Sequence, residues 1–288
     1  MQLALIGVGL IGGSAAWAMK KAGIFDCVSA CDLRIENVQK AADLGIVDKV
    51  AANIEEALNE ADAVMLAVPV LAMEAVFKEV GQYVKDTALI TDVGSCRQSV
   101  IAAAKRSLGE KFKNYAPVHP IAGGEMPGIE YAQSDLFVGA KAISTPEFGM
   151  DVEAVQFWEK AWKAAGSNVL RMTPAEHDTV FAEVSHVPHI LSFVMVDSLL
   201  YGDDFDRRLS FAGAGFRDFT RIAASSSRMW SDICIANKEA ILTSLKGFEA
   251  DLAQVTRAIE KGDIAALERV FEKASAVRRK LFVRKPLH

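Results

Sequence analysis

Two side chains in this sequence stand where they could hold a hydroxyl group or accept its proton. Ser95 follows an apolar run that predicts a strand and opens a helical segment, so its hydroxyl should be exposed, as the helix N-cap or against a ligand. His119 precedes Pro120 in a stretch rich in Gly and Pro, where we expect a loop to present its ring. An imidazole with a pKa of about 6.5 is a suitable general base, and a structural hydrogen bond is the alternative role.

Two further histidines, His186 and His189, lie three residues apart and share one face of a predicted helix. Such a pair could bind a metal ion, but neither a carboxylate nor a cysteine completes a recognisable ligand set, so we predict no metal. Pro188 stands between them and predicts a kink that frees a backbone carbonyl group nearby. The pair could therefore contact a ligand or simply fill the kinked helix.

An arginine-rich segment follows, Arg217-Asp218-Phe219-Thr220-Arg221. On an ordinary, partly solvated helix Asp218 would pair with one of the arginines, and composition alone favours this interpretation. Alternatively, the planar guanidinium group of one arginine could bind a substrate carboxylate.

The start of the chain indicates the scaffold that would position these side chains. Gly7-Val-Gly-Leu-Ile-Gly12 lies between an apolar run and a helix-favouring segment, the context of a dinucleotide site. Gly7 permits the tight turn, Gly9 lets the backbone approach a pyrophosphate, and Gly12 lets the helix pack close to the strand. Asp32 ends the next strand, where it can bind an adenosine ribose. The residues predicted to contact the cofactor are Gly7, Gly9, Leu10, Ile11, Gly12, Asp32, Arg34, Val68, Pro69 and Ser95.

Predicted strands and helices alternate for more than a hundred residues. Short apolar runs such as residues 63–68 suit parallel strands that are buried on both faces, and ligands bind beyond the carboxyl ends of such strands. The pattern predicts an α/β fold with a Rossmann-type, doubly wound parallel sheet.

The pattern changes after residue 172, beyond which we predict only helices. Thr173, Pro174 and Glu176 form a capping box at the start of the first of them. We therefore predict a dinucleotide-binding domain at residues 1–171 and an all-helical domain at residues 172–288.

Composition limits the partners and the compartment. A formal net charge of −5 provides no basic excess for a nucleic acid or an anionic membrane surface, so a small molecule is the expected partner. Residues 1–19 carry no charge, but the four glycines and the missing basic region argue against a signal peptide or membrane span. The four cysteines show no paired spacing, which indicates free thiols in a reducing cytoplasm.

Taken together, these motifs resemble those of the prephenate and arogenate dehydrogenases of tyrosine biosynthesis. Beside the glycine turn, the resemblance rests on Asp92-x-Gly-Ser95, His119-Pro-Ile-Ala-Gly123, Ser185-His-x-Pro-His189 and Asp218-Phe-Thr-Arg-Ile-Ala223. It spans nearly the whole chain, and the last three segments are far more specific than the glycine turn. It implies that the helical domain dimerises and that the active site lies between the domains.

The resemblance also implies roles for particular residues. His119 would take the proton of the ring hydroxyl as hydride leaves for the nicotinamide, and Ser95 would help to hold that hydroxyl and the cofactor. The residues implied to bind the substrate are Arg221, His189, Glu125 and His186. The expected reaction is oxidative decarboxylation of prephenate to 4-hydroxyphenylpyruvate, with conversion of arogenate to tyrosine as a further activity.

Two preferences follow from single residues. Asp32 should repel a 2′-phosphate and favour NAD, although Arg34 could turn toward that phosphate and allow some use of NADP. His189 should favour prephenate, because an imidazole can donate a hydrogen bond to the keto acid whereas imidazolium repels the ammonium group of arogenate.

Two other interpretations share the fold. Another two-domain dehydrogenase or imine reductase would place a lysine or an acidic residue in the cleft, and a non-catalytic dinucleotide sensor would not need His119, Ser95 or Arg221. We expect neither a mutase domain before the first strand nor a regulatory domain after the helices.

Overall fold

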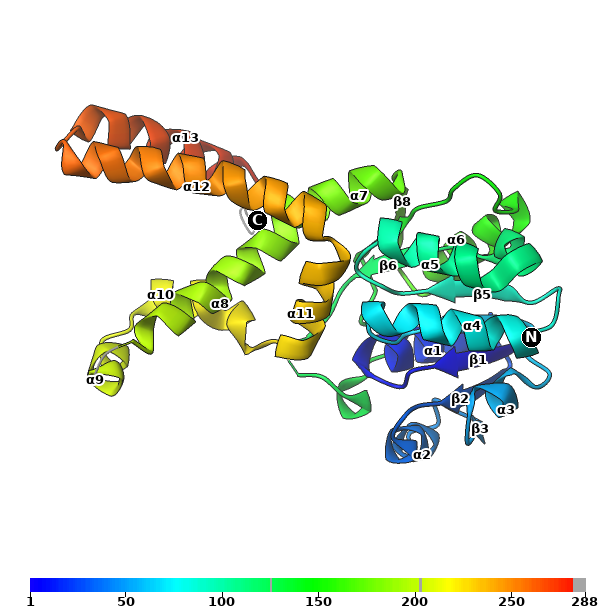
Figure 1. Ribbon diagram of the computed structural model, residues 1–288. Coiled ribbons are helices and arrows are strands. Elements are labelled where there is room, and N and C mark those ends of the chain that lie inside the picture. Colours follow the sequence, from blue (N-terminus) through cyan, green and yellow to red (C-terminus); the bar gives the residue numbers. More distant parts are fainter. Residues whose placement is uncertain (125, 202–203, 282–288) are drawn as a thin grey trace, which may run out of the picture. The chain divides into compact units, whose positions relative to one another are not determined.

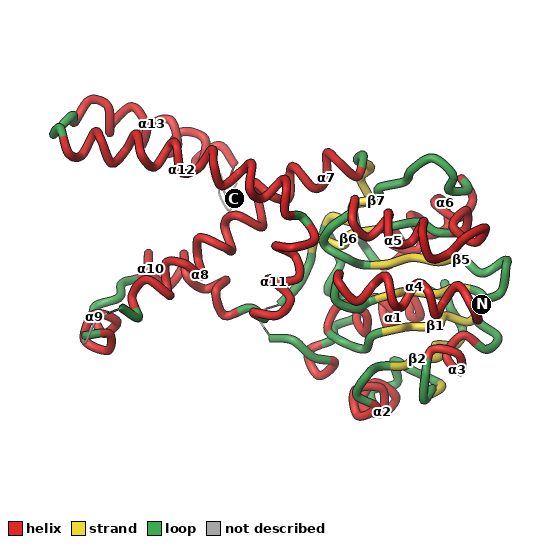
Figure 2. The backbone as a smooth tube through the Cα atoms, in the orientation of Figure 1, coloured by secondary structure: helices red, strands yellow, loops and turns green. Residues whose placement is uncertain are grey.

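The computed structural model describes residues 1–124, 126–201 and 204–281. The chain divides into two compact units, residues 1–240 and the part from residue 241 onward. The first unit contains all the described strands and most of the helices (Figure 1; Figure 2).

A parallel sheet forms the centre of the first unit. Its strands are β1 (Gln2–Ile6), β2 (Cys27–Cys31), β3 (Lys49–Val50), β4 (Ala63–Leu66) and β5 (Leu89–Asp92), in the order β3-β2-β1-β4-β5. β1 pairs in register with both of its neighbours, and every residue of β4 is buried. Uninterrupted apolar strands of this kind are typical of parallel sheets that are covered on both faces.

Helices cover both faces of this sheet. They are α1 (Leu10–Lys21), α2 (Ile35–Asp43), α3 (Ile54–Leu58), α4 (Met73–Tyr83), α5 (Gln98–Leu108) and α6 (Val152–Ala164). One core cluster joins the sheet to α1, α2 and α6 through residues such as Met19 and Trp158. A second cluster joins the other face to α3, α4 and α5 through residues such as Phe77 and Ile101. The predicted doubly wound fold is confirmed.

The later strands form a second, smaller sheet. β6 (Val118–Ile121), β7 (Lys141–Ser144) and β8 (Asn168–Arg171) lie in the order β6-β7-β8, with β6 antiparallel to β7. His119 pairs with Ile143 inside this sheet, so the predicted loop at His119 was wrong. Pro120 is tolerated because β6 is an edge strand, where a missing backbone N–H breaks no ladder.

Helices follow from Thr173, as predicted. They are α7 (Pro174–Phe181), the π-helical turn η4 (Ala182–His186), α8 (Val187–Leu199), α9 (Phe205–Ser210), α10 (Ala214–Thr220), α11 (Ser227–Ala236), α12 (Lys238–Glu260) and α13 (Ile264–Leu281). Short 3₁₀ turns are η1 (Val70–Ala72), η2 (Gly109–Asn114), η3 (Ile129–Tyr131) and η5 (Arg221–Ala224). The Thr173 hydroxyl accepts the N–H of Glu176, which confirms the predicted cap. A π-helical turn, η4, lies just before Pro188, where the sequence predicted a kink.

The second unit is a helical hairpin. α12 and α13 run side by side in Figure 1, and Gly262, with φ of +64°, lies in the turn between them. The apolar side chains of this hairpin include Leu252, Ile259 and Phe271, all of which are more than half exposed.

By length and composition alone, the helical segment Pro174–Leu199 could cross a membrane. It nevertheless carries buried polar side chains, His177 and Asp178, which hydrogen-bond to residues packed on the sheets. This segment is therefore an integral part of the first unit.

Candidate active site

A cavity of about 430 Å³ opens beyond the carboxyl ends of β1, β4 and β5. The remaining walls come from β6 with the loop that follows it, and from α11 with the residues before it. The wall contains these residues that the sequence singled out: Gly9, Leu10, Ile11, Gly12, Val68, Pro69, Ser95 and His119. The cavity thus brings the glycine turn and the candidate base together.

The glycine turn needs its glycines for different reasons. Gly7 has φ of +93°, and a Cβ atom there would lie 2.5 Å from the carbonyl oxygen of Ala67. A Cβ atom on Gly12 would lie 2.6 Å from the carbonyl oxygen of Gly7, whereas one on Gly9 would meet no described atom within 4 Å. The backbone at Gly9 therefore borders open space at the start of α1, an arrangement that fits a dinucleotide pyrophosphate.

Asp32 lies just beyond β2 and is held in place by its neighbours. Its carboxylate accepts hydrogen bonds from the N–H of Val8 at 2.8 Å, the N–H of Arg34 at 2.9 Å and the side chain of Asn37 at 3.1 Å. Val8 belongs to the glycine turn, where the pyrophosphate is expected. The Asp32 carboxylate therefore joins that turn to the position expected for the ribose. Arg34 is exposed and precedes α2.

His119 projects from β6 into the cavity wall. Its Nδ1 atom lies 2.9 Å from Nε2 of His177, and its ring packs against Phe181 with centroids 5.0 Å apart. Burial holds the pKa of His119 well below its ordinary value, and the neighbouring side chains of His177 and Arg97 act in the same direction. At neutral pH the ring is therefore an uncharged base.

Ser95 lines the cavity, and it does not take the alternative role of helix N-cap. α5 begins at Gln98, and the caps of its first N–H groups come from α7. The carboxylate of Asp178 accepts the N–H of Arg97 at 2.8 Å and that of Gln98 at 2.9 Å. Since this cap comes from a residue far along the chain, Ser95 keeps its hydroxyl at the cavity.

A buried ion pair supports the loop that carries Ser95. The guanidinium group of Arg97 donates two hydrogen bonds to Asp92, at 2.7 and 3.2 Å, and both side chains are fully buried. Asp92 also accepts from the N–H of Gly94 and the hydroxyl of Tyr115. Sequence reasoning missed Asp92 and Arg97 as supports, although a buried carboxylate at a strand end requires a cationic partner.

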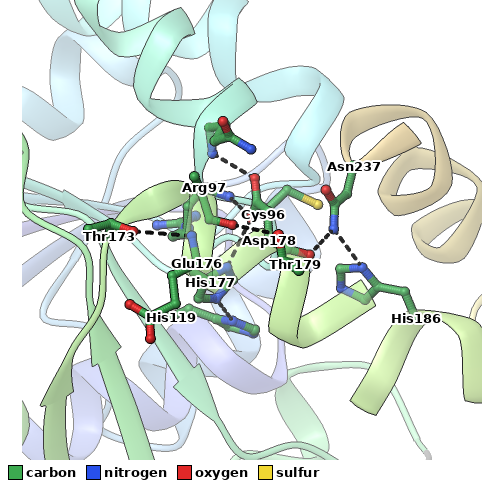
Figure 3. A network of polar contacts seen from close by, with 12 residues as sticks. Cys96, Arg97, His119, Thr173, Glu176, His177, Asp178, Thr179, His186 and Asn237 are labelled. Carbon is green, nitrogen blue, oxygen red and sulfur yellow. Dashed lines mark hydrogen bonds and ion pairs between the residues drawn. The ribbon is translucent and has the colours of Figure 1, made fainter. Parts of the chain in front are cut away.

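Two further residues that the sequence reasoning missed stand behind His119. Figure 3 shows His119, His177 and Asp178 in one continuous chain of polar contacts. His177 and Asp178 both lie on α7 and are almost completely buried. The available signal was an adjacent His-Asp pair in the first turns of α7.

Three residues of the C-terminal part were predicted to bind the substrate: His186, His189 and Arg221. None of them is among the residues that line this cavity. His189 donates from Nδ1 to the carbonyl oxygen of Ser185 at 2.8 Å and stacks on Trp230, with ring centroids 3.8 Å apart. Arg221, at the start of η5, lies close enough for its charge to lower the pKa of His189, where burial is the larger cause. His189 thus lies on Trp230, the neighbour of the wall residue Met229, and the charge of Arg221 reaches His189.

His186 is placed differently from His189. It is 1% exposed, and its Nδ1 atom accepts a hydrogen bond from the Asn237 side chain at 3.1 Å. Burial lowers the pKa of His186 to about 4. These contacts give His186 a structural position behind the site.

Glu125 lies outside the described residues. Within the described part of the chain, no group of three or more His, Cys, Asp or Glu side chains is arranged to hold a metal ion. The thiols of Cys27, Cys31, Cys96 and Cys234 are free.

Comparison with known proteins identifies the family. The family model for the nucleotide-binding domain of prephenate dehydrogenase matches residues 15–171, and the model for its dimerization domain matches residues 173–273. The prephenate dehydrogenase of Bacillus subtilis is 33% identical over 95% of this chain and 74% of its own length. The cyclohexadienyl dehydrogenase of Zymomonas mobilis is 34% identical over 91% of this chain and 89% of its own.

A solved structure agrees with these matches. The prephenate dehydrogenase of Aquifex aeolicus, in complex with hydroxyphenyl propionate and NAD⁺, superposes with a TM-score of 0.91 at 32% identity. The superposition covers 98% of each chain. The resemblance seen in the motifs is confirmed, and this chain is an oxidoreductase that belongs to the prephenate dehydrogenase family.

Proposed function

We propose that this chain catalyses the oxidative decarboxylation of prephenate to 4-hydroxyphenylpyruvate with NAD⁺ as the oxidant. One observation carries the proposal: an uncharged histidine, His119, shares a single cavity with the glycine turn. A base and a hydride acceptor that face the same space are what oxidation of a hydroxyl group requires.

In this proposal His119 accepts the proton of the ring hydroxyl at Nε2, and Ser95 orients that hydroxyl. Gly9 and Gly12 of the glycine turn would hold NAD⁺, which would supply the hydride acceptor for the ring carbon that bears the hydroxyl group. The bond to the ring carboxylate breaks and CO₂ leaves. The electron pair of that bond completes the aromatic ring, and the ring oxygen takes its proton back from His119 to give the phenol. The chain's main task is to hold hydroxyl, base and cofactor in line, because aromatisation strongly favours the product.

Arg221 is proposed to hold a carboxylate of the substrate, and His189 to contact the other end of the substrate. His189 acts differently from the expectation raised by the sequence. Because its Nδ1–H is used by Ser185, the neutral ring offers only an acceptor at Nε2, which suits an ammonium group. Binding of the keto acid therefore rests chiefly on Arg221, and we propose that arogenate is accepted beside prephenate. A relative named cyclohexadienyl dehydrogenase supports this broader substrate class.

The cofactor preference rests on Asp32. Its carboxylate is fixed by the N–H of Val8 and by Asn37, so it cannot easily swing away from a 2′-phosphate. We propose NAD as the preferred cofactor, with Arg34 allowing weaker use of NADP.

Assembly and location complete the proposal. Val184 in η4 and Val194 in α8 are 66% and 57% exposed, and a second copy of the chain would remove such apolar side chains from water. We propose a cytoplasmic homodimer whose helical domain begins at residue 172, and the family's dimerization domain supports this. Light scattering of the parent and of Val194→Asp tests it, since the variant should be a monomer.

The reaction is tested by following reduced-cofactor absorbance with prephenate and arogenate, each with NAD and NADP. His119→Asn should lower kcat by roughly 10²- to 10⁴-fold with a smaller change in substrate KM, whereas Arg221→Ala should chiefly raise KM. His186→Gln is the matched control, a buried histidine placed behind the site. Absence of turnover with both substrates, or unchanged kcat in His119→Asn, would contradict the proposal.

A further inference from the structure

The candidate base His119 is the outer member of a buried chain of hydrogen bonds. Its Nδ1 atom lies 2.9 Å from Nε2 of His177, and Nδ1 of His177 lies 2.9 Å from Oδ1 of Asp178 (Figure 3). The chain ends at α5, where the two carboxylate oxygens of Asp178 accept the N–H groups of Arg97 and Gln98.

The protons in this chain can be assigned from its inner end. Asp178 accepts two backbone N–H groups, and these bonds together with His177 hold its pKa below the ordinary value although burial alone would raise it. The carboxylate is therefore ionised and can only accept, so Nδ1 of His177 carries a proton. Burial lowers the pKa of His177, so its ring is neutral and Nε2 is an acceptor.

The same reasoning then fixes His119. Its Nδ1 faces an acceptor and must donate, which leaves the lone pair of the neutral ring on Nε2. His119 also lines the cavity, so its unprotonated nitrogen is the one left for a ligand.

We infer that His177 and Asp178 are positioning residues that hold His119 as the tautomer with its proton on Nδ1, so that Nε2 is the base. This inference rests on the proposed function, in which His119 takes the hydroxyl proton. When that proton arrives at Nε2, the Nδ1–H of the new imidazolium already points at His177, and the hydrogen bond becomes charge-assisted. No proton has to move along the chain, and the negative charge of Asp178 stabilises the new positive charge.

The surroundings of the chain support this arrangement. The positive charge of Arg97 is matched by Asp92, and the low pKa of His186 keeps that ring neutral at pH 7. Phe181 stacks on His177 with ring centroids 4.3 Å apart and also packs on His119. These contacts restrict rotation of both imidazole rings.

The direct test is the ¹⁵N spectrum of the histidine side chains at neutral pH, without substrate. The chain has only five histidines, so loss of signals in His119→Asn assigns His119. We expect a protonated Nδ1 and an unprotonated Nε2 in the parent protein. A proton on Nε2 in the parent would overturn the inference without the need for any further variant.

Variants at His177 test what the hydrogen bonds behind His119 contribute to catalysis. Gln at this position keeps an acceptor at the place of Nε2, whereas Leu has similar volume and no acceptor. His177→Leu should release the tautomer and lower kcat roughly 10- to 100-fold with KM values changed less than about twofold, and His177→Gln should restore most of kcat. Phe181→Leu is the packing control, which should leave the His119 tautomer unchanged.

Two outcomes separate this inference from the proposed function. If His119→Asn retains kcat while the parent shows the expected tautomer, the proposed role of His119 fails and the structural inference stands. If His119→Asn loses kcat but His177→Leu keeps both tautomer and rate, the positioning role is refuted.

Discussion

Replacing Gly9 with alanine separates the needs of the fold from those of the cofactor. Gly9 has φ of −113° and ψ of −166°, a conformation open to alanine, and an added Cβ would meet no described atom within 4 Å. The methyl group would instead project into the cavity, at the point where the glycine turn should approach a pyrophosphate. Gly9→Ala should therefore leave the fold intact and weaken binding of NAD⁺.

The expected magnitudes follow from that geometry. Reduced entropy of the unfolded chain would add up to about 1 kcal/mol to the free energy of unfolding, and the poorer alanine N-cap removes a similar amount, so the net change should stay within about 1 kcal/mol. We expect the Kd for NAD⁺ to rise at least about tenfold, equal to roughly 1.4 kcal/mol. Gly12→Ala is the contrasting control, because its Cβ would lie 2.6 Å from the carbonyl oxygen of Gly7 and 2.7 Å from Cβ of Ala67. It should lower the free energy of unfolding by about 1–3 kcal/mol.

Urea unfolding and calorimetric titration with NAD⁺ measure the two quantities separately. The reasoning is refuted if Gly9→Ala binds NAD⁺ as tightly as the parent, or if it is destabilised as much as Gly12→Ala. In the first case the cavity beside Gly9 is not the place of the pyrophosphate. In the second case, a methyl group at Gly9 disturbs the packing of the turn, although the structure shows open space there.

Three further predictions concern buried charge. Because burial lowers the pKa of His119, the acid limb of kcat/KM should have an apparent pKa below about 6.5, and a profile that already halves above pH 7 would contradict this. Arg97→Leu leaves Asp92 buried without its partner and should lower the free energy of unfolding, measured by urea titration, by about 3–5 kcal/mol. Combining Arg97→Leu with Asp92→Leu should restore part of that lost stability. His186, with a pKa of about 4, stays neutral in the folded chain, whereas in the unfolded chain it binds a proton near pH 6.5. The free energy of unfolding should therefore fall by at most about 3 kcal/mol as the pH drops from about 6.5 to 4. His186→Gln should flatten that dependence when unfolding is measured at pH 7.5 and 5, and an unchanged slope would exclude His186 as its source.

Features whose chemistry is local could be predicted from the sequence. The turn at Gly7 follows from a backbone conformation that only glycine adopts easily, and the Thr173 cap follows from a hydrogen bond that spans three residues. The alternation of short apolar runs with helices likewise predicts the parallel sheet, because each run is buried within its own segment. In each case the residues that decide the outcome are neighbours in the sequence.

The parts that were missed depend on residues far apart in the chain. Asp178 caps a helix that begins 80 residues earlier, and Ser95 therefore does not take the alternative role of helix N-cap. His119 lies in a strand because Ile143 pairs with it, and a local excess of Gly and Pro concealed that pairing. His177 has no motif of its own, and its role is visible only once His119 lies 2.9 Å away.

Asp178 connects these distant features, because one carboxylate serves both the fold and the proposed chemistry. It caps α5, ties that helix to α7, and accepts the hydrogen bond from Nδ1–H of His177, the residue inferred to orient the base. The proposed domain boundary at residue 172 therefore falls between His119 and the residues that position it. A fragment of residues 1–171 would keep the glycine turn, Asp32 and His119, but α5 would lose its cap and the imidazole would lose its acceptor. If the proposal holds, the helical domain prepares the base, in addition to its proposed role in binding the substrate.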